Sequence, residues 1–149
     1  MLNEYDAHAR QYIERDFHSP KVSTLSFAGF LKRYDCFSYP QGRPGSPVVI
    51  DMGCGGGSGL HHFAAVAPNI KFLGIDYNSD LIEWSTRKFI GYGKPYHKDN
   101  LTLSYGDWND HQTILKMVDN DFILGVTSVH SLCTQKYFDQ AASSLLALK

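Results

Sequence analysis

The stretch VVIDMGCGGGSGLHHF, Val48 to Phe63, combines the residue types in this sequence that are best suited to binding a small ligand. An apolar run ends near the carboxylate of Asp51, and glycines follow at Gly53, Gly55 and Gly57. Glycine destabilises a helix or strand interior by about 0.5–1 kcal/mol relative to alanine, so this cluster belongs in a turn. Such a turn provides positive φ angles, or an approach that a Cβ atom would block. The second need indicates a ligand or another chain segment.

Two common nucleotide-binding patterns do not match this turn. A P-loop requires a lysine followed by serine or threonine after the glycines, and the segment 57–59 contains no lysine. The dinucleotide pattern G-x-G-x-x-G would begin at Gly53 and Gly55, but Ser58 occupies its third glycine position and Asp51 has no role in it. A carboxylate beside the turn repels a pyrophosphate and suits an ammonium or sulfonium group.

An acidic residue followed by glycines two, four and six positions later resembles the first motif of the class I S-adenosylmethionine-dependent methyltransferases, (D/E)-x-G-x-G-x-G. Asp51, Gly53, Gly55 and Gly57 match that motif completely. The resemblance implies a Rossmann-like fold and S-adenosyl-L-methionine as the cofactor. It also implies that these four residues and Cys54, which lies between the glycines, bind the cofactor.

Two later acidic residues follow apolar runs in the same way. In FLGIDYN, Asp76 stands where one carboxylate can accept hydrogen bonds from both hydroxyls of a ribose. The resemblance makes Asp76 the ribose ligand and places Tyr77 beside the adenine. In LSYGDWND, Asp107 and Trp108 match the adenine-binding position of the family, and tryptophan offers a flat surface to a purine. Alternatively, Asp76 caps the helix that follows it. At the later position, the alternative is that Asp107 stands at the entry of a helix and Trp108 packs in the core.

The segment FILGVTSVHSL matches the strand that the family places opposite the glycine turn, so its end, Thr127 to His130, should lie near the methyl donor. Thr127 is therefore a candidate cofactor ligand. His130 is the candidate general base, because imidazole titrates near neutrality, and its alternative is a structural histidine. The [DN]-P-P-[YF] and P-C motifs of nucleic-acid methyltransferases are absent, which favours a small-molecule acceptor.

The other histidines and cysteines give weaker signals. His61 and His62 are adjacent on a predicted helix, so they point to different faces and cannot hold a metal together; we expect solvated side chains. Cys54 has no base nearby in the sequence, and we expect it to fill space. His130 and Cys133 form an isolated H-x-x-C, which is insufficient for zinc. We predict no metal site.

The composition favours a soluble, globular, cytoplasmic protein. The chain has 149 residues, 43% hydrophobic and 19% charged, which suits one domain. A net charge of -1 and a pI near 6.6 give no general attraction to nucleic acid or to anionic membranes. The three cysteines are far apart and form no C-x-x-C pair, which argues against disulfides. We find neither a secretory leader nor a membrane span in the sequence.

The segment SYPQGRPGSP divides the chain into two regions. Residues 1–46 are predicted to form an N-terminal helical cap or lid, and residues 47–149 the cofactor-binding α/β core. Tyr5, Tyr12 and Phe17 occur at helical spacing in the first predicted helix, where they could cover the cofactor or pack into the core.

In the second region, short apolar runs alternate with helical patterns. Because the runs are apolar throughout, they predict a doubly wound, mostly parallel sheet with helices on both faces and ligands at the carboxyl ends of the strands. The expected strands are PVVIDM, IKFLGI, LTLSY and FILGVTSV, and the expected helices cover 59–67, 79–89, 109–117 and 134–148.

Four strands are fewer than the seven of the methyltransferase family. We therefore expect an N-terminal portion of a longer protein, a natural truncation, or a sheet completed by another chain. The fourth strand would otherwise leave an apolar edge, so we predict association of chains through that edge. The leading functional hypothesis is a methyltransferase or its cofactor-binding part. A non-catalytic cofactor-binding or interaction module is the alternative, and a fragment of an NAD(P)-dependent oxidoreductase is the third.

Overall fold

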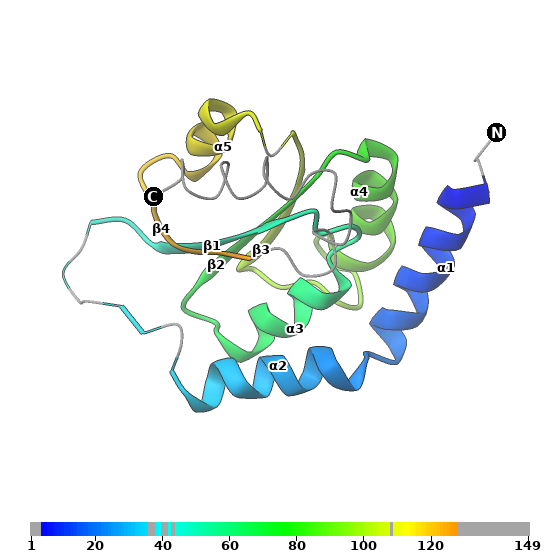
Figure 1. Ribbon diagram of the computed structural model, residues 1–149, viewed down its shortest axis with the longest axis horizontal. Helices are drawn as coiled ribbons and strands as arrows, with labels where there is room; N and C mark the ends of the chain where they lie inside the picture. The colour runs from blue at the N-terminus through cyan, green and yellow to red at the C-terminus, as the bar shows by residue number, and fades with distance from the viewer. Residues whose placement is uncertain (1–3, 36–37, 40–41, 43, 108, 128–149) are drawn as a thin grey trace.

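The computed structural model describes residues 4–35, 38–39, 42, 44–107 and 109–127. Helices and strands alternate along the second region as expected, and two helices precede them (Figure 1). In chain order the elements are α1 (Glu4–His18), α2 (Val22–Arg33), β1 (Pro47–Met52), α3 (Ser58–Val66), β2 (Lys71–Asp76), α4 (Ser79–Ser85), the π-helical turn η1 (Thr86–Ile90), β3 (Leu101–Tyr105), α5 (His111–Val118) and β4 (Phe122–Thr127).

The four strands form one parallel sheet in the order β3-β2-β1-β4. The chain runs outward from β1 to β3 and then crosses to the other side of β1, so the strand order reverses beside β1. Ligands of doubly wound sheets bind at this kind of reversal. The predicted fold class, a doubly wound α/β sheet, is confirmed, and the predicted glycine turn follows the strand at the reversal.

Helices cover both faces of the sheet (Figure 1). Successive residues of a strand point to opposite faces. Val49 and Phe72 belong to the core under α3, α4 and η1, whereas Ile50 and Ile75 pack with Ile114 of α5. Both faces of β1 are therefore buried, which explains why its sequence is an uninterrupted apolar run up to Asp51.

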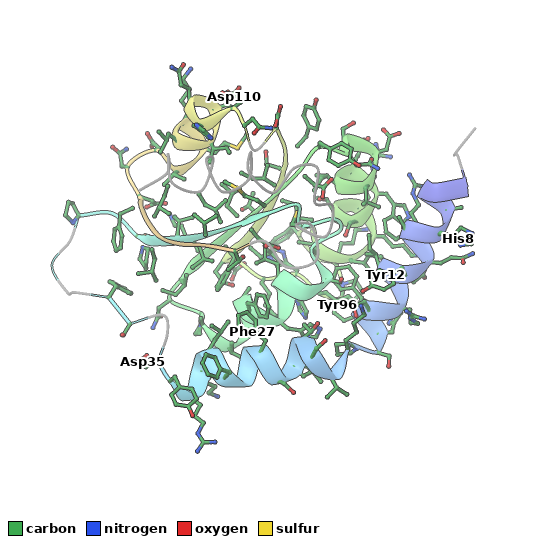
Figure 2. All side chains as sticks on the ribbon, in the orientation of Figure 1. His8, Tyr12, Phe27, Asp35, Tyr96 and Asp110 are labelled. Atoms are coloured by element: carbon green, nitrogen blue, oxygen red, sulfur yellow. The ribbon has the colours of Figure 1, made fainter. Side chains whose placement is uncertain are left out.

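The two N-terminal helices form an outer layer over α3. Phe17 of α1 is 2% exposed and stacks on Phe89 of η1, with ring centroids 4.4 Å apart. Phe27 of α2, labelled in Figure 2, forms a T-shaped pair with Phe63 of α3, with ring centroids 5.5 Å apart. The structure thus gives Phe17 the core-packing role, whereas Tyr12 is 38% exposed.

The helix boundaries differ from the sequence prediction at two places. The helix expected over 79–89 becomes α4 followed by η1, and Gly91 N–H donates to the Thr86 carbonyl to close the wider turn. The helix expected from residue 109 begins at His111, because the Asp110 side chain accepts a hydrogen bond from Thr113 N–H as its N-cap. No described helix is long and apolar enough to cross a membrane.

One side chain joins the end of α3 to the start of β3. Asn100 Nδ2 lies 3.1 Å from the carbonyl oxygens of Ala64 and Ala67 and 2.9 Å from that of Ile70. Ala64 lies in the last turn of α3 and Ala67 is the C-cap of this helix, and the Ala67 carbonyl also accepts a hydrogen bond from Ile70 N–H at 3.1 Å. Asn100 therefore ends α3 and fixes the connection into β2.

We expect Asn100→Ala to lower the free energy of unfolding by about 1–3 kcal/mol, because it removes the side-chain donor that contacts the Ala64, Ala67 and Ile70 carbonyl groups. Urea denaturation measures this change. Asn120→Ala is the matched control. The side chain of the exposed Asn120 donates to the neighbouring Asp119, and this substitution should change stability by less than about 0.5 kcal/mol. Equal losses in both variants would contradict the proposed role of Asn100.

Candidate functional site

The glycine turn after β1 has the backbone conformation that its sequence requires. Gly53, Gly55 and Gly57 have φ angles of 74°, 56° and 74°, in the left-handed region that other residues rarely adopt. The N–H groups of Gly53 and Cys54 donate to the Ile75 carbonyl at 2.7 and 3.1 Å. The turn is thus fastened to the end of the neighbouring strand β2.

Two of the glycines make room for side chains of the protein itself. A Cβ atom at Gly56 would lie 2.7 Å from Ile13 Cγ2 of α1, and one at Gly57 would lie 2.7 Å from Leu103 Cδ2 of β3. At Gly55 the nearest atom to such a Cβ is Ile13 Cδ1, at 3.9 Å. The close approach inferred from the sequence is therefore partly internal packing, and among the described residues the space beside Gly55 is open.

Asp76, at the end of β2, binds the glycine turn directly. Its Oδ2 accepts a hydrogen bond from Gly55 N–H at 2.8 Å, and its Oδ1 accepts one from Asn78 N–H at 2.9 Å. The N-cap of α4 is Asn78, whose side chain accepts from Leu81 N–H at 3.0 Å, so Asp76 is not the helix cap. The carboxylate is 8% exposed and its described bonds leave acceptor positions unused.

Asp51 and Thr127 meet across the strand reversal. They are paired in the register of β1 and β4, and Thr127 Oγ1 donates to Asp51 Oδ1 at 2.8 Å. Asp51 is 5% exposed. The structure therefore brings together two of the residues that the sequence assigned to the cofactor.

The two carboxylates give the turn a negative electrostatic environment. The pKa of the Cys54 thiol is raised well above its usual value, first by burial and then by the charges of Asp51 and Asp76. A protonated thiol is a poor nucleophile, so the expected space-filling role suits Cys54. The same charges that hold the proton on this thiol would attract a cationic ligand.

The residues assigned to the adenine lie on neighbouring loops. Tyr77 directly follows Asp76 and is 73% exposed. Gly106 N–H donates to the Asp76 carbonyl at 3.0 Å, which holds the loop after β3 beside the loop after β2. Asp107 is exposed, and its Oδ1 accepts from both the backbone and the side-chain nitrogen of Asn109 at 2.9 Å. Trp108 and His130 lie outside the described residues.

Residues outside the predicted set support the turn. Ser58 Oγ donates to Asp16 Oδ2 of α1 at 2.8 Å, and Ser85 Oγ of α4 donates to the Gly56 carbonyl at 2.6 Å; all these side chains are buried. The sequence offered one signal, because Asp16 stands between apolar residues of the first helix that share its buried face. Its partner Ser58 is distant in the sequence and could not be inferred.

The paired histidines differ from the sequence prediction. We expected solvated side chains, which is wrong for His61, since it is 8% exposed at the interface of α1 and α3. Its ring lies 5.3 Å from that of Tyr96 and 6.1 Å from that of Phe17. Burial, together with the nearby His62 and Lys98, lowers the pKa of His61 to about 4.

Within the described part of the chain, no group of three or more His, Cys, Asp or Glu residues could hold a metal.

An all-parallel sheet with this glycine turn after β1 fits the Rossmann-like methyltransferase fold. Similar solved structures include the plantazolicin methyltransferase BpumL in complex with a monoazolic desmethylPZN analog and SAH, which is 17% identical, with 72% of this chain and 37% of that chain covered and a TM-score of 0.46. The plantazolicin methyltransferase BamL in complex with a triazolic desmethylPZN analog and SAH is 18% identical. The match covers 81% of this chain and 40% of that chain, with a TM-score of 0.47.

An O-methyltransferase family protein from Burkholderia thailandensis is 11% identical, with 74% of this chain and 29% of that chain covered and a TM-score of 0.45. This chain thus spans less than half the length of each of the three proteins. No protein-family model matches the sequence, and no curated protein matches it.

We expect Gly56→Ala to destabilise the protein by about 1–3 kcal/mol, because its Cβ would overlap Ile13. Ile13→Ala should cost about 2–5 kcal/mol through the cavity it leaves. The double variant should lose about 0.5–3 kcal/mol less stability than the sum of the two single losses, because alanine at position 13 no longer overlaps the Cβ atom at position 56. Urea denaturation of all four proteins measures this coupling, and strict additivity would contradict the packing role of Gly56.

The lowered pKa of His61 predicts a pH dependence of stability. Between pH 6.5 and about 4 the unfolded chain binds a proton at His61 and the folded chain does not, so stability falls as the pH falls through this range and levels off below it. His61→Gln should reduce this slope in urea denaturation between pH 7 and 4. His8→Gln, at an exposed position on α1 (Figure 2), is the control and should keep the slope of the unmodified protein. An undiminished slope in His61→Gln would refute the assignment.

Proposed function

We propose that this chain binds S-adenosyl-L-methionine at the carboxyl ends of β1, β2 and β4, as the cofactor-binding part of a methyltransferase that acts on a small molecule. One observation carries the proposal. Two buried carboxylates, Asp51 and Asp76, end neighbouring parallel strands on either side of a turn whose Gly55 leaves its surroundings open. A ligand suited to this place is cationic and carries hydroxyl groups.

The donor set fits the parts of this cofactor. Asp51 would face the positively charged methionine portion, since its carboxylate lies beside the turn. Asp76 would hold the ribose hydroxyls with the acceptor positions that Gly55 and Asn78 do not use. Tyr77 and Asp107, on the loops after β2 and β3, would lie beside the adenine.

When bound, the cofactor supplies a methyl group already activated by a sulfonium centre, so the protein's contribution is orientation. The glycine turn holds its backbone in place through Asp76, and the carboxylates favour a cation over an anion at the same position. Cys54 does not serve as a base or nucleophile, because its raised pKa keeps the thiol protonated. His130 as the general base stays a prediction, as do the cytoplasmic location and the association of chains through the outer edge of β4.

Isothermal titration calorimetry with S-adenosyl-L-methionine and S-adenosylhomocysteine tests the proposal. Asp76→Asn should weaken binding about tenfold or more, because a charged acceptor contributes about 1.5–3 kcal/mol to a hydrogen bond. Gly55→Val should abolish binding, since its side chain would occupy the open space beside the turn.

Two controls separate binding from folding. Asp99→Asn changes a carboxylate whose side chain is 99% exposed, and Gly93→Val imposes the same backbone strain, at φ 75°, where a Cβ meets no other atom. Both should bind the cofactor like the unmodified protein. Absence of binding by the unmodified chain would refute the proposal, and binding without methyl transfer to any acceptor would favour the non-catalytic module. Tighter binding of NADH than of S-adenosyl-L-methionine would favour the oxidoreductase.

A further inference from the structure

A cleft of about 520 Å³ lies between α1 and the α4–η1 segment, which run beside each other in Figure 1. It adjoins the glycine turn without sharing its residues, since Arg10 lies one helical turn before Ile13 and Asp80 lies in the first turn of α4. The lining residues are Arg10, Asp80, Glu83, Trp84, Arg87, Lys88 and Lys94.

The lining carries more positive than negative charge, although the whole chain has a net charge of -1. Glu83 pairs with Arg87 within the lining, and Lys88 pairs with Glu14 of α1 at 2.7 Å. Among the described side chains, no ion pair joins Arg10 or Lys94 to a carboxylate. Within the described lining, two cations, Arg10 and Lys94, are therefore left against the single carboxylate of Asp80.

Trp84 gives the cleft an aromatic surface. Its ring is half-buried and is held edge-on against Phe89, with centroids 5.3 Å apart and planes at 82°. The Arg10 guanidinium carbon lies 5.4 Å from the ring centroid, and Lys88 Nζ lies 5.5 Å from it. The Nε atom of Arg10 is buried and has no hydrogen-bond acceptor among the described residues. A flat ring and a fork of N–H donors thus lie side by side.

These groups match one kind of ligand. Guanidinium and ammonium groups bind carboxylate and phosphate through charge-assisted hydrogen bonds, and an aromatic ring stacks on another planar ring. The volume is within the range of small-molecule sites. We propose that the cleft binds a small molecule in which a carboxylate or phosphate is attached to a planar ring, with the anion at Arg10 and Lys94 and the ring against Trp84. The assignment does not depend on the cofactor or on the proposed function.

Fluorescence titration of Trp84 tests the proposal. The chain has two tryptophans, so Trp108→Phe leaves Trp84 as its only tryptophan, whose emission is excited selectively beyond the absorption of the tyrosines. Benzoate and phenyl phosphate, added at constant ionic strength, should change its emission in a saturable way and thereby show which anion is preferred. Benzyl alcohol, which has the ring without the charge, should bind at least about tenfold more weakly, because it lacks the charge-assisted bonds. Absence of a saturable change with both anions, or equal binding of benzyl alcohol, would overturn the proposal.

Substitutions in the same background locate the anion. Arg10→Gln and Lys94→Gln should each weaken binding of the preferred anion about tenfold. Arg15→Gln on the exposed face of α1 and the exposed Lys116→Gln are matched controls that should leave the dissociation constant unchanged. Lys94 is exposed in a loop, so its variant should fold even if Arg10→Gln does not. Unchanged affinity in Lys94→Gln, or an equal loss in the controls, would refute the assignment.

Discussion

The hydrogen bond from Gly55 N–H to the Asp76 carboxylate is the interaction on which the candidate site depends. It joins the turn after β1 to the end of β2, and the second oxygen of the same carboxylate holds Asn78 at the start of α4. One buried side chain therefore sets the relative positions of a turn, a strand end and a helix start. A group that organises three elements in this way can also present its unused acceptor positions to a ligand without further ordering, which lowers the entropic cost of binding.

The glycine turn is held from its other side by α1. Ile13 packs on Gly56, and Asp16 accepts the Ser58 hydroxyl at the start of α3, so the N-terminal helix is part of the support of the turn. The aromatic contacts of Phe17 with Phe89 and Tyr96 extend this support towards the surface. A displacement of α1 would therefore change the packing around the turn. The cleft between α1 and α4 would change with it, because α1 forms one of its walls.

The electrostatic arrangement separates two neighbouring places. Asp51 and Asp76 place negative charge around the turn, and this charge adds to burial in raising the pKa of Cys54, whereas Arg10 and Lys94 leave the adjacent cleft positive. Opposite fields at adjoining sites would direct a cation to one and an anion to the other. The turn and the cleft therefore favour ligands of opposite charge.

The sequence by itself determined the parallel α/β fold and the place of the turn, because both follow from local patterns: apolar runs between helical stretches, and glycines directly after a strand. Its resemblance to the methyltransferase family also singled out Asp51, Asp76 and Thr127 as candidates, and the parallel topology places all three at the carboxyl ends of the strands. Only the tertiary structure decided that Ile13 and Leu103 occupy the space beside Gly56 and Gly57, that His61 is buried, and that Arg10 faces Trp84. These contacts join residues that are far apart in the chain. Helix and strand propensities and the spacing of apolar residues are local properties, so they do not specify which distant side chains come into contact.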